Sequence, residues 1–442
     1  MAQLKARPWV PKTSETLIQT VARETAAADA DALGRLIDTL VTENREIHDR
    51  DCVNLNPATN IMNPHAEAVL AKGLGTRPSL GYPGKKYEMG LEAIERIEII
   101  AAELAAEVFN ARYAEVRVPS GAIANLMMFI AATKPGDTII VPPSTLGGHV
   151  THHKAGAAGL YGLDVREASA EPENYSVDLE RLRRQAKTAN PTLITIGGSL
   201  NLFPHPVREI RAIADEVGAL VLYDAAHMSG MIAGRAWQQP LEEGAHAMTM
   251  STYKSLGGPP AGLIVTNDTT LAKRFDEIAY PGLTANFDVA KTAALAITLL
   301  DWKVYGSDYA KTMAATAQAL ADNLAAEGLT IYARARGYTT THQFAVEASR
   351  HGGGQTAARR LRRANILSSG IGLPGPSMQS DVNGLRLGTP EIVRRGMGPE
   401  DMGELARLIA GALEGDLPPE RLANDVTAFR RRFTKLKFVR TA

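Results

Sequence analysis

Short apolar segments alternate with amphipathic ones between residues 138 and 267. This alternation limits the possible folds of the chain more than any other feature of its sequence. Five of the segments are bounded mostly by turn residues and have the length of buried strands: TIIVPPS, LITIGGS, ALVLYDAAH, AMTMSTYK and GLIVTN. Amphipathic stretches with helical spacing, such as VREIRAIADEVG, lie between several of them. This order predicts a parallel sheet with helices on both faces, and ligands bound at the carboxyl ends of its strands.

The remaining pattern predicts how the chain is divided. Its 442 residues are enough for two or three domains. We predict an N-terminal helical arm over residues 1–55, a large domain over 56–300 and a smaller C-terminal domain over 301–442. Residues 51–90 are rich in Asn, Pro and Gly, on a scale that is unusual for an idle linker.

Charge and cysteine content argue against several classes of function. Lys plus Arg and Asp plus Glu both number 48, so no net field favours nucleic acid or an anionic membrane as a partner. Cys52 is the only cysteine, which leaves no internal disulfide and no thiolate metal cluster. The first residues lack the apolar core of a signal peptide, and no apolar run reaches membrane-spanning length. We therefore expect a cytoplasmic protein.

Three polar residues stand at the ends of two neighbouring strand-like segments. Asp224 lies three residues before His227, and Lys254 ends the next segment just before Gly-Gly-Pro-Pro. The carboxylate and the imidazole can hold the two polar edges of a pyridine ring, and the lysine can form an imine with an aldehyde. Taken singly, a half-exposed lysine or a satisfied aspartate explains each residue equally well. The ordered set favours an enzyme that uses pyridoxal phosphate.

Two more segments supply groups for the phosphate and the ring of such a cofactor. Backbone N–H groups of Gly121 and Ala122, with the Ser120 hydroxyl, could hold a phosphate at a helix N-terminus, although an ordinary N-cap serine gives the same pattern. His149 follows two glycines, which let its ring approach a cofactor ring closely. The HVTHH run also suggests a metal, but no obvious carboxylate or cysteine partner lies nearby, so we expect no metal.

The same chemistry suggests how a substrate is held. Asp224 would keep the pyridine nitrogen protonated, so that the ring can take up negative charge from the substrate α-carbon. Arg386, in NGLRLGTPEIVRRG, could bind an amino-acid carboxylate through two parallel hydrogen bonds. A surface arginine in a strand is the competing interpretation.

Six segments, in order, resemble those of serine hydroxymethyltransferase, a fold-type I pyridoxal phosphate enzyme: GYPGKKY, PSGAIAN, LGGHVTH, YDAAHMSG, the lysine segment and GLRLGTPEIVRRG. The resemblance runs from about residue 50 to the C-terminal helix. It implies the α/β, aspartate aminotransferase-like fold, with a mostly parallel central sheet, helices on both faces and a smaller α+β C-terminal domain. It also implies a homodimer, or a dimer of dimers, with shared active sites.

The resemblance gives a role to each matching position. Lys254 matches the Schiff-base lysine, Asp224 the partner of the pyridine nitrogen and His149 the stacking ring. Arg386 matches the arginine that binds the substrate carboxylate, and Tyr87 matches an active-site tyrosine that a neighbouring subunit donates. The remaining implied cofactor contacts are Ser120, Gly121, Ala122, Asn125, Ser199, Ala226, His227, Ser251 and Gly282, the last of which would reach the neighbour's phosphate.

Several positions depart from the family pattern. Pro78 and Leu80 stand where the family usually has a tyrosine and a glutamate, and leucine cannot transfer a proton. Further replacements are Glu88 for a tyrosine, Tyr253 for a histidine, Pro260 for an arginine and Ala58 for a serine. We predict that Glu88 or Tyr253 takes over the missing acid/base role, and that Ala58 lies beside the substrate.

These features predict aldol cleavage of, or hydroxymethyl transfer from, a β-hydroxy-α-amino acid such as serine or α-methylserine. The small-molecule partners are then an amino acid and an aldehyde. Pyridoxal 5'-phosphate is the expected cofactor, whereas Leu80 and Glu88 argue that tetrahydrofolate is needed weakly or not at all, as in α-methylserine aldolase-like enzymes. Three alternatives stay open: an ordinary folate-dependent enzyme, a transaldolase or aminotransferase on the same scaffold, and a binding protein that has lost turnover.

Overall fold

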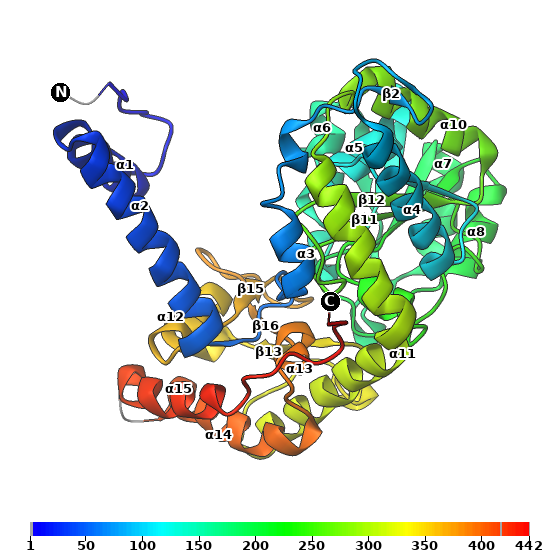
Figure 1. The fold of residues 1–442 in the computed structure, drawn as a ribbon. Helices are drawn as coiled ribbons and strands as arrows, with labels where there is room; N and C mark the ends of the chain where they lie inside the picture. Colours follow the sequence, from blue (N-terminus) through cyan, green and yellow to red (C-terminus); the bar gives the residue numbers. More distant parts are fainter. Residues whose placement is uncertain (1–2, 416–417, 442) are drawn as a thin grey trace. The chain divides into compact units, whose positions relative to one another are not determined.

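The computed structural model describes residues 3–415 and 418–441 (Figure 1). The chain divides into two compact units; the first ends at Cys52 and the second begins at Val53. The first unit holds helices α1 (Lys12–Ala27) and α2 (Ala30–Arg45) and the π-helical turn η1 (Glu46–Asp51); within these described helices no side chain is buried. The domain limits at 55 and 300 stay predictions, although helix α11 (Val289–Ala326) runs across residue 300.

The second unit is built on a seven-stranded sheet. In spatial order its strands are β4 (Tyr113–Glu115), β12 (Gly262–Thr266), β11 (Ala247–Ser251), β10 (Leu220–Asp224), β9 (Leu193–Gly197), β5 (Thr138–Val141) and β6 (Asp164–Glu167). Strands β11, β10, β9 and β5 pair in parallel, as expected, and the edge strand β6, which was not predicted, pairs in parallel with β5.

Strand β12 corrects one expectation. We expected GLIVTN to form a parallel strand, but β12 is antiparallel to both of its neighbours, β11 and β4. Only residues 252–261 separate β11 from β12, and this connection is too short to hold a crossover helix. The chain therefore turns back along β11 instead of crossing over.

Both faces of this sheet are covered by helices because successive side chains of a strand point to opposite sides. On one face Leu222 and Ala247 share a core with α5 (Gly121–Ala132) and α10 (Thr269–Glu277). On the other face, the strand residues that alternate with Leu222 and Ala247 along β10 and β11 share a core with α4 (Glu92–Phe109), α7 (Leu179–Ala189) and α8 (Val207–Asp215). The helix predicted from VREIRAIADEVG is thus confirmed as α8.

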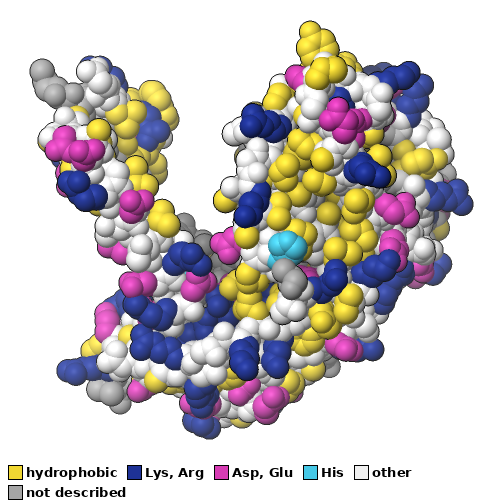
Figure 2. Space-filling model, viewed as in Figure 1, with side chains coloured by type: hydrophobic (Ala, Val, Ile, Leu, Met, Phe, Trp, Pro, Cys, Tyr) yellow, Lys and Arg dark blue, Asp and Glu magenta, His cyan; other side chains and the backbone are white. Residues whose placement is uncertain are grey.

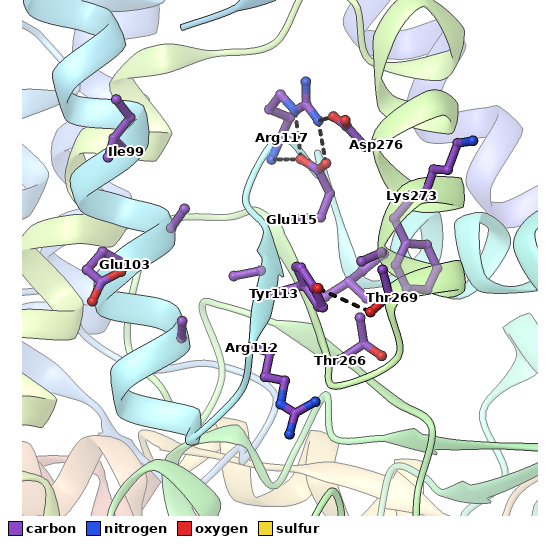
Figure 3. A pocket seen from close by; sticks show the side chains of 16 residues that line it. Ile99, Glu103, Arg112, Tyr113, Glu115, Arg117, Thr266, Thr269, Lys273 and Asp276 are labelled. Carbon is purple, nitrogen blue, oxygen red and sulfur yellow. Dashed lines mark hydrogen bonds and ion pairs between the residues drawn. The ribbon is translucent and has the colours of Figure 1, made fainter.

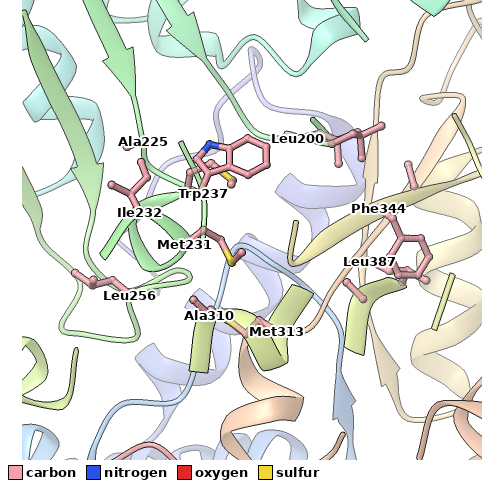
Figure 4. Close-up of a cluster of buried hydrophobic side chains, with 14 of the residues drawn as sticks. Leu200, Ala225, Met231, Ile232, Trp237, Leu256, Ala310, Met313, Phe344 and Leu387 are labelled. Atoms are coloured by element: carbon pink, nitrogen blue, oxygen red, sulfur yellow. The ribbon is translucent and has the colours of Figure 1, made fainter. Parts of the chain in front are cut away.

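A second, antiparallel sheet orders its strands as β13 (Gln343–Glu347), β16 (Gly384–Gly388) and β15 (Ser369–Ile371). Helix α12 (Gly354–Arg363) packs on it, and α14 (Met402–Glu414) packs on α12 and on α11. Figure 4 shows the buried side chains that join the two sheets, with Ala225 and Met231 beside the large sheet and Phe344 and Leu387 on β13 and β16. This shared core holds β16 in place relative to the large sheet.

The shorter elements of the second unit are β1 (Val53–Asn54), α3 (Pro64–Val69), β2 (Gly81–Tyr82), β3 (Lys85–Lys86), α6 (Ala157–Leu160), β7 (Ala170–Glu171), β8 (Ser176–Val177), α9 (Ser229–Ala233), β14 (Ile366–Leu367), α13 (Pro390–Arg394) and α15 (Ala423–Arg431). Among the described helices, none has the length and apolar character needed to cross a membrane. Strands β9, β10 and β11 run in one direction, so their carboxyl ends at Gly197, Asp224 and Ser251 lie along the same edge.

Candidate active site

A cavity at this edge gathers most of the residues that the sequence singled out. It is lined by Ser120, Gly121, Ala122, Asn125, His149, Gly198, Ser199, Asp224, Ala226, His227, Ser251, Tyr253 and Lys254. Of these, only Gly198 was not among the predicted site residues. The cavity thus collects residues from the carboxyl ends of β9, β10 and β11 and from the start of α5, although the roles of these residues stay predictions.

Lys254 is a buried amine, with 7% of its surface exposed. Among the described residues its Nζ has no hydrogen-bond acceptor, and the ring of Tyr253 lies 6.0 Å from it. Burial lowers the pKa of Lys254 to about 8, against the opposing attraction of Asp224 and with a further contribution from Arg386. A substantial share of this amine is therefore neutral near pH 7 to 8, which is the form that attacks an aldehyde.

This lowered pKa predicts how cofactor capture depends on pH. The amine is protonated below pH 8 and neutral above it, so the rate at which cofactor-free protein captures pyridoxal phosphate should rise about tenfold per unit below pH 8 and then level off. Stopped-flow absorbance of the cofactor between pH 6 and 10 measures this rate. A rate that keeps rising through pH 9, as for an ordinary surface lysine, would contradict the expectation.

Asp224 is a buried carboxylate that accepts three hydrogen bonds. His152 Nε2 lies 2.8 Å and Asn125 Nδ2 2.9 Å from Oδ2, while the Ala226 N–H donates to Oδ1 at 2.9 Å. Burial opposes ionisation, but these bonds outweigh it and hold the pKa of Asp224 far below its usual range. The site therefore presents a fixed negative charge, which suits a protonated pyridine nitrogen.

His152 is the functional residue that the sequence pattern did not identify. The HVTHH run indicates it only as a possible metal ligand, because its carboxylate partner lies far away in the sequence. In the fold its ring lies against Asp224 and edge-on to Phe129, with ring centroids 5.6 Å apart. Over the described residues, no group of three or more His, Cys, Asp and Glu side chains gathers as a metal site would require.

The start of helix α5 provides an anion cradle beside the cavity. The Ser120 hydroxyl accepts the N–H of Ile123 at 3.2 Å, so the ordinary N-cap is present. The first N–H groups of a helix, here those of Gly121 and Ala122, have no intrahelical acceptor and can bind a phosphate. A Cβ on Gly121 would lie 2.3 Å from Ser251 Oγ, so a larger residue would close this corner.

Two imidazoles border the cavity, that of the half-buried His149 and that of the buried His227. Burial is the main cause that lowers the pKa of His149, and it holds the pKa of His227 well below the usual value. The Thr151 N–H donates to His149 Nδ1 at 3.3 Å, which assigns the ring proton to Nε2. A Cβ on Gly148 would lie 2.1 Å from the Pro142 carbonyl oxygen, so only glycine fits just before His149.

Arg386 reaches this region from β16. Burial lowers its pKa to about 10, so it stays cationic at neutral pH. Its Nη1 donates to the Ser199 carbonyl oxygen at 2.5 Å, and its Nε and Nη2 both donate to Ser369 Oγ, at 3.3 and 3.0 Å. No carboxylate within the described parts of the chain pairs with it. A buried guanidinium without a counter-charge is suited to an anionic substrate group.

The predicted residues Tyr87, Glu88 and Gly282 do not line the cavity of their own chain. Tyr87 follows the β2–β3 hairpin and is 79% exposed. The Tyr82 ring of that hairpin packs edge-on against Tyr280, with centroids 5.8 Å apart, so the hairpin lies beside the turn that contains Gly282. The two segments that the family resemblance assigns to a neighbouring subunit therefore lie next to each other.

Ala58 also lies outside the cavity lining. Its N–H donates to Asn56 Oδ1 at 3.1 Å, and the same oxygen lies 3.4 Å from Ser369 Oγ. The loop that carries Ala58 is thus connected to Arg386 through Ser369.

A larger groove, of about 590 Å³, lies between α4, β4 and α10 (Figure 3). The charged side chains on one side of this groove already pair with one another, because Arg117 forms ion pairs with both Glu115 and Asp276 at 2.6 Å. The rest of its lining includes small apolar side chains such as Ala102 and Ala106. Its one lysine, Lys273, is an exposed side chain near Glu277, so the smaller cavity is the better candidate for the site.

Comparison with known proteins adds independent information. A family model described as serine hydroxymethyltransferase matches residues 34–409. An alpha-methylserine aldolase of Variovorax paradoxus is 61% identical over 438 residues, covering 99% of each chain. An alpha-methylserine aldolase of Ralstonia sp is 59% identical over 437 residues, covering 99% of this chain and all of that protein. A serine hydroxymethyltransferase of Methanopyrus kandleri is 39% identical over 391 residues, covering 88% of this chain and 91% of that protein.

Proposed function

Because this chain belongs to the serine hydroxymethyltransferase family, we propose that it cleaves α-methylserine, or a close β-hydroxy-α-amino acid, into an aldehyde and the remaining amino acid. Enzymes of this family use pyridoxal 5'-phosphate, and this chain is an enzyme of that aldolase and hydroxymethyltransferase type. One observation carries the finer proposal: four relatives named alpha-methylserine aldolase are 59–61% identical over 99% of this chain, whereas four relatives named serine hydroxymethyltransferase are 36–39% identical.

The residues around the cavity fit pyridoxal phosphate. The Lys254 amine is buried and unpaired, the Asp224 carboxylate is fixed as an anion, and the start of α5 can take a phosphate. Once bound, the cofactor supplies an electron sink for the charge left on the substrate α-carbon. Asp224 would hold the ring nitrogen, and His149 would lie against the ring face.

The proton transfers can be assigned to this chain's own groups. Cleavage breaks the Cα–Cβ bond, removes the β-hydroxyl proton and returns a proton to Cα, so the site needs one acceptor and one donor. We propose Tyr253 as the group that handles the hydroxyl proton, because it lines the same cavity as Lys254. The Lys254 amine, freed when the substrate amine takes its place, would return the proton to Cα. Glu88 of a neighbouring subunit is the alternative to Tyr253.

A substrate panel tests this proposal. We expect cleavage of α-methylserine without tetrahydrofolate, at least about tenfold more efficiently than serine or threonine, because a fitted methyl group is worth a factor of this order. Leu80 is the reason to expect no folate requirement, since it replaces the family's acid/base glutamate. Aldehyde release, measured as kcat/KM with and without tetrahydrofolate, decides the question. Strict dependence on folate, with serine preferred, would make the chain an ordinary hydroxymethyltransferase.

We further propose a homodimer, or a dimer of dimers, with shared active sites, in line with the oligomers typical of the family. The exposed Tyr87 and the neighbouring Gly282 turn support this arrangement, because neither serves the cavity of its own chain. Figure 2 shows hydrophobic side chains on the face over helices α4 and α11, where Ile99 and Val304 are 54% and 58% exposed. A second subunit would cover such a surface. The cytoplasmic location stays a prediction.

A further inference from the structure

Ser369 holds one edge of the Arg386 guanidinium. Its Oγ accepts from Nε at 3.3 Å and from Nη2 at 3.0 Å. A hydroxyl oxygen has two lone pairs and one proton, so these two bonds use its whole accepting capacity. The Ser369 proton must then be donated elsewhere, and Asn56 Oδ1 receives it at 3.4 Å.

Asn56 is itself held in place. Its N–H donates to Asn54 Oδ1 at 3.0 Å, and Asn54 Nδ2 donates to Glu391 at 2.6 Å. Its own Oδ1 accepts from the Ala58 N–H and from Ser369, so its acceptor side faces the serine. Asn56 belongs to the Asn-, Pro- and Gly-rich segment that is unusual for a linker. This segment thus supports Ser369, which contacts Arg386.

The hydrogen bonds from Arg386 to Ser369 and Ser199 leave part of the guanidinium free to bind a ligand. A guanidinium carries five N–H groups, and Ser369 and the Ser199 carbonyl take one from each of its three nitrogens. One N–H remains on each terminal nitrogen and is free to donate to a carboxylate oxygen. The groups that accept hydrogen bonds from Arg386 are all neutral, so none competes with a substrate anion for the positive charge.

We propose that Ser369, supported by Asn56, is a positioning residue that orients Arg386 for the substrate carboxylate. The proposal rests on the proposed function only in taking Arg386 as the carboxylate-binding group. In Ser369→Ala the guanidinium loses one acceptor and the two hydrogen bonds made to it, and it can rotate, so ligands with a carboxylate bind less tightly. Ligands without one are unaffected.

A pair of matched ligands tests the proposal in the cofactor-loaded protein. Alanine carries the carboxylate, whereas 2-aminopropan-1-ol has the same skeleton with a hydroxymethyl group in its place. By calorimetry, Ser369→Ala should raise the Kd of alanine about tenfold, as expected for a lost hydrogen bond to a charged group, and leave the Kd of the amino alcohol within about twofold. In turnover, KM for the amino acid should rise while kcat changes little.

Neighbouring substitutions provide the controls. Ser368→Ala removes a hydroxyl one residue away that has no hydrogen-bond partner among the described residues, and it should leave both dissociation constants unchanged. Ser369→Thr keeps the hydroxyl and should retain most of the alanine affinity. Equal weakening of both ligands in Ser369→Ala, or no weakening, would overturn the positioning role.

Arg386→Lys separates this proposal from the proposed function. If that variant keeps the full preference for alanine over the amino alcohol, Arg386 is not the carboxylate site, whatever Ser369 does. If the preference is lost in Arg386→Lys but intact in Ser369→Ala, Arg386 keeps its role and only the positioning proposal fails.

Discussion

Replacing Lys254 with alanine should lower kcat by about 10⁴-fold, the size of loss seen when a covalent catalytic group is removed. Lys254 supplies the only amine among the residues that line the described cavity, and the cofactor would lose its covalent attachment. We expect pyridoxal phosphate to wash out of Lys254→Ala on gel filtration but to stay with the unchanged protein. Cofactor absorbance and aldehyde release after filtration measure both effects.

Two controls accompany this variant. Lys311→Ala removes an exposed lysine of α11 and should keep full activity. Unfolding temperature should not fall in Lys254→Ala, because the amine has no hydrogen-bond acceptor among the described residues and is costly to bury. Retention of more than a hundredth of the activity would contradict the role of Lys254.

The same variant tests whether sites are shared. If Tyr87 serves the neighbour's cavity, Tyr87→Ala and Lys254→Ala chains refolded together should regain activity in about a quarter of the sites, since half of the random dimers carry one intact site. No recovery, together with sedimentation of a single monomer, would exclude the proposed shared dimer.

Replacing Asp224 with asparagine should lower kcat about 10³-fold, the upper end of the effect of removing one preorganised electrostatic group. The change keeps the shape of the side chain but removes the fixed charge that would keep the ring nitrogen protonated. It also turns an amide donor toward one of the three N–H groups that now donate to the carboxylate, so one donor loses its acceptor. Steady-state turnover and the affinity for pyridoxal phosphate measure the loss.

Asp301 offers a matched control for that substitution. It is also a buried aspartate, and it accepts hydrogen bonds from the Asn63 side chain and the Arg440 N–H, away from the cavity. Asp301→Asn should lower the unfolding temperature yet leave kcat within about threefold. If Asp224→Asn also keeps kcat within that range, the charge of Asp224 is not needed for the reaction.

Much of the candidate site could be predicted because its residues stand at the ends of strands. Asp224 and Lys254 were expected to lie close together, since each follows an apolar run and parallel strands bring their carboxyl ends to one edge. The cavity lining agrees with that expectation. Tyr87 and Gly282 illustrate the limit, because their family roles require a neighbouring chain and their own cavity does not include them.

The sequence by itself determined the local elements and the chemistry available to them, because apolar periodicity, turn residues and strand ends are properties of neighbouring positions. The tertiary structure alone decided the partners of these groups. His152 meets Asp224 across 72 residues, and Asn56 meets Ser369 across 313. No local pattern specifies such pairs, because they depend on how closely packed strands and loops bring distant side chains within hydrogen-bond distance. The direction of β12 was likewise set by a connection that has no room for a helix.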